Sequence, residues 1–275
     1  MVQIVKLWSF RISLLVGFFF SMHSSYGQSL TSDTLKVKDE ITAFSQDRTG
    51  NIFLTFKGGA ITKYSPSMDS LISFSPEKLG DISLLEAWHG FQIFAFYEEF
   101  QEFVLFDRFL TRATRYQLSQ SSANYADICT ISSDQNLWIF EENELRIIKL
   151  NLNVRAVEID VPLEFVLDTS EHNITFLREY QNLVFLVDAN SGIYVLDNLG
   201  NYLRKIDAPG INTCSFKGDH LFYLYNEEVH DINLYEGSHD IIKLNAGNYM
   251  GVLALENALL IVQKNKVVKI SLISN

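Results

Sequence analysis

Residues 41–74, ITAFSQDRTGNIFLTFKGGAITKYSPSMDSLISF, have the pattern of four short strands separated by turns. The apolar run Ile52–Phe56 ends at Gly58 and Gly59, and a second strand-like run, Ala60–Tyr64, follows at once. Further copies of this pattern, spaced by about forty residues, begin at Ile82, Ile128, Ile174, Ile211 and Tyr249. Repeats of this kind predict an all-β fold, a six-bladed β-propeller of four-stranded antiparallel blades.

The second strand of each copy is the easiest to recognise, because it is a nearly continuous apolar run. These runs are Ile52–Phe56, Gln92–Phe96, Leu137–Phe140, Leu183–Val187, Leu221–Tyr225 and Leu259–Val262. Such runs are typical of strands that neighbouring sheets cover on both faces. They are too short for buried helices, and turn residues interrupt them. The fourth strands, such as Arg112–Leu118, are more polar, as expected at the outer edge of a blade.

The sixth copy ends after its third strand, Val267–Ser271. The missing fourth strand is found near the start of the chain, where Asp33–Lys38 is similar to Asp69–Phe74, the fourth strand of the first copy. We therefore expect the N-terminal strand to close the ring by pairing Leu35 and Val37 with Val267–Ser271, which removes a free sheet edge. Residues 161–172 fit no copy. Pro162 argues against a central strand there, and a long loop and a hairpin both remain open.

The first 27 residues have the pattern of a signal peptide, and residues 28–275 then form the propeller. Lys6 and Arg11 flank the start of the apolar run 12–22, and the small residues Ser25 and Gly27 predict cleavage before Gln28. The alternative is an uncleaved N-terminal anchor. No later apolar stretch is long enough to span a bilayer. The sequence thus predicts a periplasmic or secreted protein without a transmembrane anchor after cleavage.

The net charge of the chain argues against nucleic acid as a partner, and the positions of its two cysteines argue against a disulfide. Loss of Lys6 and Arg11 with the signal peptide changes the formal net charge from −11 to −13. An acidic chain of this kind is not expected to bind nucleic acid. Cys129 and Cys214 fall in first strands that lie two copies apart. This separation is too large for a disulfide, so both are predicted to be free, buried thiols even though export would permit a bond.

Two turns carry a family resemblance. Phe44–Thr55 contains Asp-Arg-Thr-Gly-Asn-Ile, and Ile131–Phe140 contains Asp-Gln-Asn-Leu-Trp without the glycine. These turns resemble those of NHL-like and two-component-regulator-type propeller repeats, and the chain as a whole resembles exported propellers of Bacteroidetes-type bacteria. The resemblance implies a propeller. It also implies a binding or sensing module more often than an enzyme of the lactonase-like kind.

A candidate metal site follows from the residues that precede the first strands. We define the top face by the loops that enter the first strands and the loops between second and third strands. A carboxylate or amide recurs at the entry to the first strands, at Glu40, Asp81, Asp127, Asn173 and Asn248. Oxygen ligands of this kind suit Ca²⁺, so calcium at the channel mouth is the one cofactor we consider. The alternative is that these side chains cap turns.

Candidate partner-binding residues lie on both faces. The acids Glu98, Glu99, Glu141, Glu142, Glu227 and Glu228 follow second strands on the top face. They would attract a cation or a basic partner, or simply form a solvated surface. Trp88 and His89 occupy a turn on the opposite, bottom face. Trp88 would stack on a sugar or a partner protein, or pack beneath its own turn.

No catalytic motif is present: the chain lacks a Gly-x-Ser-x-Gly elbow, a His-Glu-x-x-His pair and a phosphate-binding loop. The sequence therefore favours an exported, non-catalytic propeller that acts as an interaction scaffold for a protein or a ligand. Two alternatives remain open at this point. One is a calcium-dependent lactonase-like or hydrolase-like enzyme, and the other is a glycan-binding module.

Overall fold

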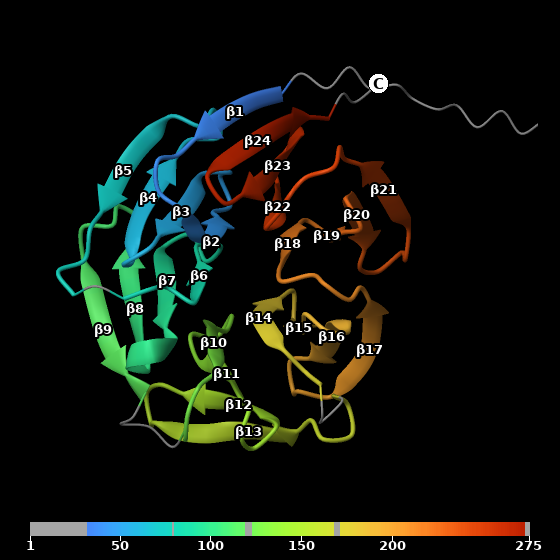
Figure 1. Ribbon diagram of the computed structural model, residues 1–275. Coiled ribbons are helices and arrows are strands. Elements are labelled where there is room, and N and C mark those ends of the chain that lie inside the picture. Colours follow the sequence, from blue (N-terminus) through green and yellow to red (C-terminus); the bar gives the residue numbers. More distant parts are fainter. Residues whose placement is uncertain (1–31, 79, 119–122, 168–170, 273–275) are drawn as a thin grey trace, which may run out of the picture.

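The computed structural model describes residues 32–78, 80–118, 123–167 and 171–272. Within these ranges the chain forms six four-stranded antiparallel sheets. The sheets are arranged as blades around a central axis, with the first strand of each blade nearest the axis (Figure 1). The six-bladed β-propeller expected from the repeat is therefore confirmed.

Blades 1 to 3 follow one another along the chain. Blade 1 comprises β2 (Ile41–Gln46), β3 (Ile52–Phe56), β4 (Ala60–Tyr64) and β5 (Ser70–Phe74). Blade 2 comprises β6 (Leu84–Glu86), β7 (Gln92–Tyr97), the 3₁₀ helix η1 (Glu98–Phe100), β8 (Glu102–Asp107) and β9 (Ala113–Gln117). Blade 3 comprises β10 (Ile128–Ile131), β11 (Leu137–Glu141), β12 (Arg146–Asn151) and β13 (Ala156–Pro162).

Blades 4 to 6 complete the ring. Blade 4 comprises β14 (Ile174–Tyr180), β15 (Leu183–Asp188), β16 (Gly192–Asp197) and β17 (Tyr202–Asp207). Blade 5 comprises β18 (Cys214–Lys217), β19 (His220–Tyr225), β20 (Glu228–Asn233) and β21 (His239–Lys243). Blade 6 comprises β22 (Gly251–Ala254), β23 (Ala258–Gln263), β24 (Lys266–Ser271) and, from the other end of the chain, β1 (Ser32–Lys36).

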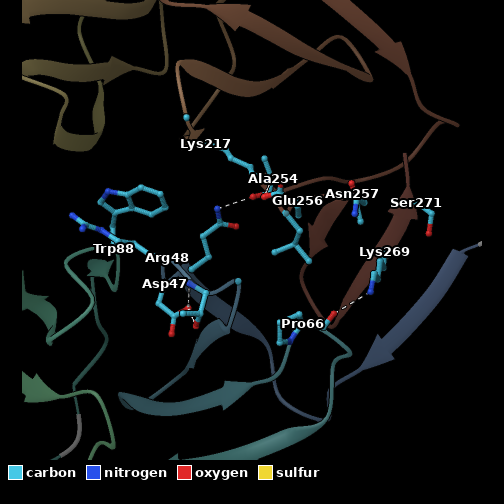
Figure 2. A pocket seen from close by; sticks show the side chains of 16 residues that line it. Asp47, Arg48, Pro66, Trp88, Lys217, Ala254, Glu256, Asn257, Lys269 and Ser271 are labelled. Carbon is cyan, nitrogen blue, oxygen red and sulfur yellow. Dashed lines mark hydrogen bonds and ion pairs between the residues drawn. The ribbon is translucent and has the colours of Figure 1, made fainter. Parts of the chain in front are cut away.

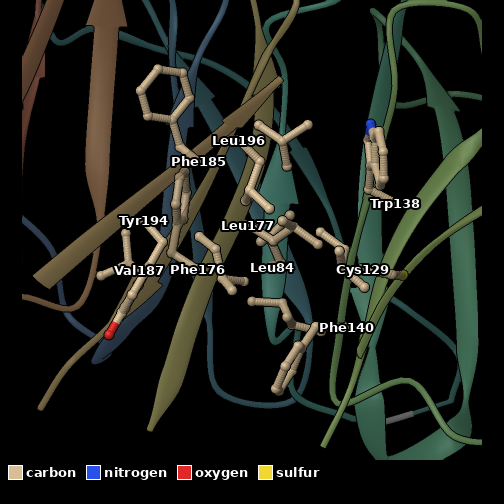
Figure 3. Close-up of a cluster of buried hydrophobic side chains, with 14 of the residues drawn as sticks. Leu84, Cys129, Trp138, Phe140, Phe176, Leu177, Phe185, Val187, Tyr194 and Leu196 are labelled. Carbon is tan, nitrogen blue, oxygen red and sulfur yellow. The ribbon is translucent and has the colours of Figure 1, made fainter. Parts of the chain in front are cut away.

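The core lies between neighbouring blades, which explains the apolar second strands. Strands β3 and β11 are buried along their whole length, whereas the outer strand β9 is exposed along its whole length. The largest cluster of buried side chains joins blades 2 to 5 (Figure 3). Its largest member, Trp138, donates its indole N–H to Oε2 of Glu179 at 2.6 Å, a bond from blade 3 to blade 4. Burial of the indole therefore leaves no unpaired donor.

Three first strands begin later than the repeat indicates. Copies start at Ile82, Ile211 and Tyr249 in the sequence, but β6 begins at Leu84, β18 at Cys214 and β22 at Gly251. Both isoleucines are still buried in the core. In blade 5 the backbone N–H of Gly210 donates to the carbonyl of Ala189 at 2.6 Å. This bond holds the entering loop against blade 4, so the chain joins its own sheet a few residues later.

The extra segment 161–172 extends the edge of blade 3 and adds no blade. Pro162 is the last residue of the outer strand β13, where its missing N–H costs no central ladder bond. The chain then turns, and the N–H of Leu163 donates to the carbonyl of Leu145 at 2.8 Å. Leu163 and Leu167 are buried against the blade. Residues 168–170 lie outside the described residues.

The ring closes as the sequence predicts. Strand β1 pairs antiparallel with β24, with Leu35 opposite Val267. Val37 differs from the expectation, because its N–H donates to the carbonyl of Asn265 at 3.0 Å, before β24 begins and outside the expected range Val267–Ser271. Leu35 and Val37 pack against the buried cluster that blades 1 and 6 share. The outer strand of blade 6 is therefore β1, from the start of the described chain.

A pair of leucines tests the closure. Leu35 on β1 packs into the shared cluster, whereas Leu71 on the equivalent strand β5 is 50% exposed. We expect Leu35→Ala to lower the free energy of unfolding by about 1–2 kcal/mol, and Leu71→Ala by less than about 0.5 kcal/mol. Urea unfolding of the two variants measures both values. Equal losses would contradict the closing role of Leu35.

The cysteines give a second test. Cys129 and Cys214 are free and buried, on β10 and β18 of two blades that are not neighbours. Burial raises the pKa of the Cys214 thiol to about 12, and it raises the pKa of the Cys129 thiol as well. We therefore expect the folded protein to resist a thiol reagent and the unfolded, unreduced protein to release two thiols. Fewer than two thiols from unfolded monomer would contradict this assignment.

Candidate functional site

The top-face acids predicted to hold a metal each have a separate partner. Glu40 forms an ion pair with Lys264 at 2.8 Å. Oδ1 of Asp81 accepts the N–H of Gly58 at 2.6 Å, and Oδ2 of Asp127 accepts the N–H of Glu142 at 2.6 Å. All three carboxylates therefore bond to loops between second and third strands, as turn-capping side chains do.

The two predicted amides are exposed in the loops that enter β14 and β22. The backbone N–H of Asn173 donates to Oδ1 of Asp188 at 2.8 Å, and Asn248 lies in the loop before β22. A cavity of about 190 Å³ does open where the first strands begin, but none of the five predicted residues lines it. Its lining includes hydroxyl and apolar side chains, among them Thr42, Phe176 and Met250.

Calcium binding on this face stays a prediction. In the described part of the chain, no three His, Cys, Asp or Glu side chains are grouped so that they could hold a metal ion. Burial and the nearby charge of Glu142 raise the pKa of Asp127, and burial and the charge of Asp127 raise the pKa of Glu98. Calcium bound here would relieve this repulsion and would appear as a higher melting temperature.

The six acids predicted to bind a partner fall into two groups. Glu99, Glu142 and Glu227 are exposed, and Glu98 is half-buried. Glu141 is buried and bonded to Nη2 of Arg146 at 2.6 Å. Glu228 is partly buried, with its two carboxylate oxygens 3.7 Å from Lys243 Nζ and from His230 Nε2. The last two side chains therefore serve interactions within the protein.

On the bottom face, the turn between β2 and β3 is built around Asp47. Its Oδ1 accepts the N–H groups of Thr49 and Asn51 at 2.9 Å each, and its Oδ2 accepts from the side chain of Asn51 at 2.7 Å. Gly50 has φ of +81°, a conformation that favours glycine. This turn is the Asp-x-x-Gly pattern seen in the sequence. It fixes the Asp47 carboxylate inward and leaves Arg48 exposed.

The hydrogen bonds of this turn set the pKa of Asp47. Burial alone would raise it, but the bonds from Asn51 and Thr49 outweigh burial and hold it below the ordinary value of 3.8. Lys63 Nζ lies 3.6 Å from Oδ2 on the other side. Asp47 is therefore charged at neutral pH and fully occupied by its own turn.

Trp88 lies in the next bottom-face turn, between β6 and β7. Its backbone N–H donates to Oε1 of the buried Glu86 at 3.0 Å, which fixes the start of the turn to the end of β6. The indole is half-buried, with its centroid 5.4 Å from the ring of Tyr180 and 5.8 Å from Cζ of Arg48. His89 is half-buried as well but does not line the cavity described next. Trp88 is therefore only partly packed beneath its own turn, and part of its side chain is exposed.

A cavity of about 510 Å³ opens on the bottom face between blades 1 and 6 (Figure 2). We call it the bottom mouth. Arg48 and Trp88 lie at one end of it, and Pro66 and Lys269 at the other. Two hydrogen bonds join its walls across the boundary between blades 1 and 6, which we call the seam. Gln46 Nε2 donates to the carbonyl of Ala254 at 2.8 Å, and Lys269 Nζ donates to the carbonyl of Pro66 at 3.1 Å.

Positive charge dominates the bottom mouth. Its cations are Arg48, Lys217 and Lys269, and its acids are Asp47 and Glu256. Asp47 is held by its turn, and Glu256 forms an ion pair with Lys217 Nζ at 2.6 Å. Arg48 has no ion-pair partner among the described residues. Two cations of the mouth thus have no acid partner among the described residues: Lys269, which donates to the carbonyl of Pro66, and Arg48, which lies beside the indole of Trp88.

A buried ion pair lies close to the turn that carries Trp88. Glu86 at the end of β6 contacts Arg178 on β14, so the pair joins blade 2 to blade 4. The guanidinium also lies 5.1 Å and 5.8 Å from the ring centroids of Phe176 and Phe216. Removing one partner of such a pair leaves a buried charge uncompensated. The pair therefore fixes the end of β6, from which the turn with Trp88 follows.

Trp88 is the one predicted site residue that lines the bottom mouth. Arg48 was visible in the sequence as the second residue of the clearest repeat turn, and Lys217 followed a first strand. What pattern reasoning missed is that they share a cavity, because the mouth combines residues of blades 1, 2, 5 and 6.

Comparisons with known proteins agree on the fold. No protein-family model and no curated protein sequence matches the chain. Virginiamycin B lyase from Staphylococcus aureus is similar in structure, with 12% identity, a TM-score of 0.60, and coverage of 89% of this chain and 100% of that one. The Cps50 (Swd1) β-propeller domain from Myceliophteria thermophila has 12% identity, a TM-score of 0.63, and coverage of 89% and 99%.

A third similar structure is the extracellular domain of a putative one-component system. The extracellular domain of BT4673 from B. thetaiotaomicron has 12% identity and a TM-score of 0.56. The match covers 84% of this chain and 33% of that one. At this level of identity, the similarities show a β-propeller fold. They do not assign an activity, because one fold hosts many functions.

The Asp47 turn yields a test with a defined pH dependence. We expect Asp47→Ala to lower the free energy of unfolding by about 1–3 kcal/mol at pH 7, since the turn loses hydrogen bonds to a charged group. The folded pKa lies below the unfolded one, so this contribution is complete above the ordinary value of 3.8 and is lost as the pH falls through the folded pKa. Denaturant unfolding at pH 7 and pH 3 measures both effects. Asp69→Ala, in an exposed turn of the same blade, is the control, and equal losses in the two variants would contradict the special role of Asp47.

Proposed function

We propose that the chain is an exported, non-catalytic propeller that binds a ligand or a partner protein at the bottom mouth. The observation that carries the proposal is the cavity of about 510 Å³ in which a half-buried Trp88 stands beside an exposed, unpaired Arg48. Cavities of about 300–1,000 Å³ are typical of ligand sites. Tryptophan and arginine are also the side chains that contribute most at protein interfaces.

The chemistry of the lining supports binding in preference to catalysis. Among the described residues that line the mouth, none is a histidine or a cysteine. The Asp47 carboxylate is occupied by its turn, and the hydroxyl of Thr49 donates to that same carboxylate at 2.7 Å. Glu256 is bonded to Lys217. The groups that remain are cations, an indole, apolar side chains and the polar side chains of Asn257 and Ser271, and the serine hydroxyl has no histidine or free carboxylate in the lining to act as its base.

The start of the closing strand supports export. The predicted signal peptide, residues 1–27, lies outside the described residues, and β1 begins at Ser32. Cleavage before Gln28 would therefore leave the closing strand intact. No described helix combines the length and the apolar character needed to cross a membrane. A similar fold also occurs in the extracellular domain of BT4673.

The test is to purify the tagged wild-type chain and single-substitution variants from native cells, and to compare the molecules that co-purify with each. We expect a bound small molecule or protein to accompany the wild type, and to be lost from Trp88→Ala and from Arg48→Ala. Arg48 is exposed, so its variant is expected to fold even if Trp88→Ala does not. Phe91→Ala is the matched control, because Phe91 is an 84% exposed aromatic residue of the same turn outside the mouth. Equal recovery in all four proteins would contradict the proposal.

A further inference from the structure

We infer that the bottom mouth recognises a small organic carboxylate with an apolar body, with Arg48 binding the carboxylate. The inference rests on the proposed function and adds the chemical class of the ligand. Three features of the mouth support it: a guanidinium without an ion-pair partner among the described residues, a carboxylate of the chain already bound at a second cation, and apolar side chains in the lining.

The first feature is the state of Arg48. An arginine presents a planar set of donors that matches a carboxylate with two parallel hydrogen bonds. The nearest acid in the chain, Asp47, cannot serve as that partner, because its oxygens accept from Thr49 and Asn51. The guanidinium lies 5.8 Å from the indole of Trp88, which positions it at the wall of the mouth. An anion from outside the chain is the partner that Arg48 lacks.

The second feature is the ion pair of Lys217 and Glu256, which joins blade 5 to blade 6 at 2.6 Å. The Glu256 side chain is 86% exposed, so it is held by little except this bond. It shows that a carboxylate can occupy the mouth beside Lys217. A ligand carboxylate would compete with Glu256 for that lysine, so Glu256 is expected to weaken binding of an anion.

The third feature is the apolar part of the lining. Trp88, Leu255 and Pro66 supply an apolar wall. The indole already has Tyr180 at 5.4 Å and Arg48 at 5.8 Å beside it, whereas a stacked sugar ring needs a free aromatic face. A ligand with an apolar body therefore suits the mouth better than a sugar acid does. Such a carboxylate can come from an N-acylated amino acid or from a simple aliphatic acid.

The experiment follows the indole N–H signal of Trp88 by NMR during titration of the purified protein with four probes. N-acetyl-leucine is the test ligand, N-acetyl-leucinamide lacks the charge, octanoate lacks the amide, and glucuronate lacks the apolar body. We expect N-acetyl-leucine, octanoate or both to shift the signal saturably with a Kd below about 1 mM. The amide should bind at least about tenfold more weakly than the acid, because it cannot form a charged hydrogen bond with Arg48.

Variants assign the effect to named residues. Arg48→Ala should weaken binding of the acid by about tenfold or more, and Glu256→Gln should strengthen it, since it frees Lys217. Arg108→Ala, which removes an exposed arginine outside the mouth, is the matched control and should leave the Kd unchanged.

Three outcomes would overturn the inference, and each differs from failure of the proposed function. Equal binding of acid and amide would show a ligand site that does not select a carboxylate. Tighter binding of glucuronate than of the two apolar acids would exclude the apolar body and favour a glycan ligand. No shift with any probe at about 10 mM, far above the expected Kd, would exclude the carboxylate class. In all three cases the co-purification test still decides whether the mouth binds a partner.

Discussion

The pairing of β1 with β24 is the contact on which the rest of the structure depends. It joins Leu35 to Val267 across nearly the whole chain and gives blade 6 its fourth strand. Without it, the third strand of blade 6 would be an exposed edge, and blades 1 and 6 would lose part of their shared core. Every other blade is formed by consecutive strands. The pairing of β1 with β24 is therefore the strand pairing that carries the entropic cost of closing a loop of nearly the whole chain.

The bottom mouth lies at the same seam. Gln46 of blade 1 bonds to Ala254 of blade 6, and Lys269 on β24 bonds to Pro66 of blade 1. The walls of the mouth are therefore held in place by the same two blades that the closing strand joins. Arg48 and Trp88 come from turns that are fixed locally, by Asp47 and by Glu86. The site thus combines locally fixed side chains with a cavity whose shape depends on the whole ring.

Sequence reasoning predicted the fold well, but it did not bring the residues of the bottom mouth together, for physical reasons. Buried second strands such as Ile52–Phe56 are apolar throughout, and the likeness of Asp33–Lys38 to Asp69–Phe74 revealed the closing strand. The starts of β6 and β18 were misplaced, because Ile82 and Ile211 are buried in loops and so carry the same apolar signal as strand residues. Counting acids by loop was also misleading for Glu141, which is buried and pairs with Arg146 and so does not contribute to the charge of the top face.

The central claim is that the closing strand makes the six blades and the mouth at their seam one cooperative unit. Native-state hydrogen exchange measures this most directly, because it reports the free energy at which each strand opens. The account predicts that the protected amides of β24 open with the same free energy as those of β11, on the far side of the ring. Opening of β1 and β24 at a much lower free energy, with β11 still protected, would contradict it.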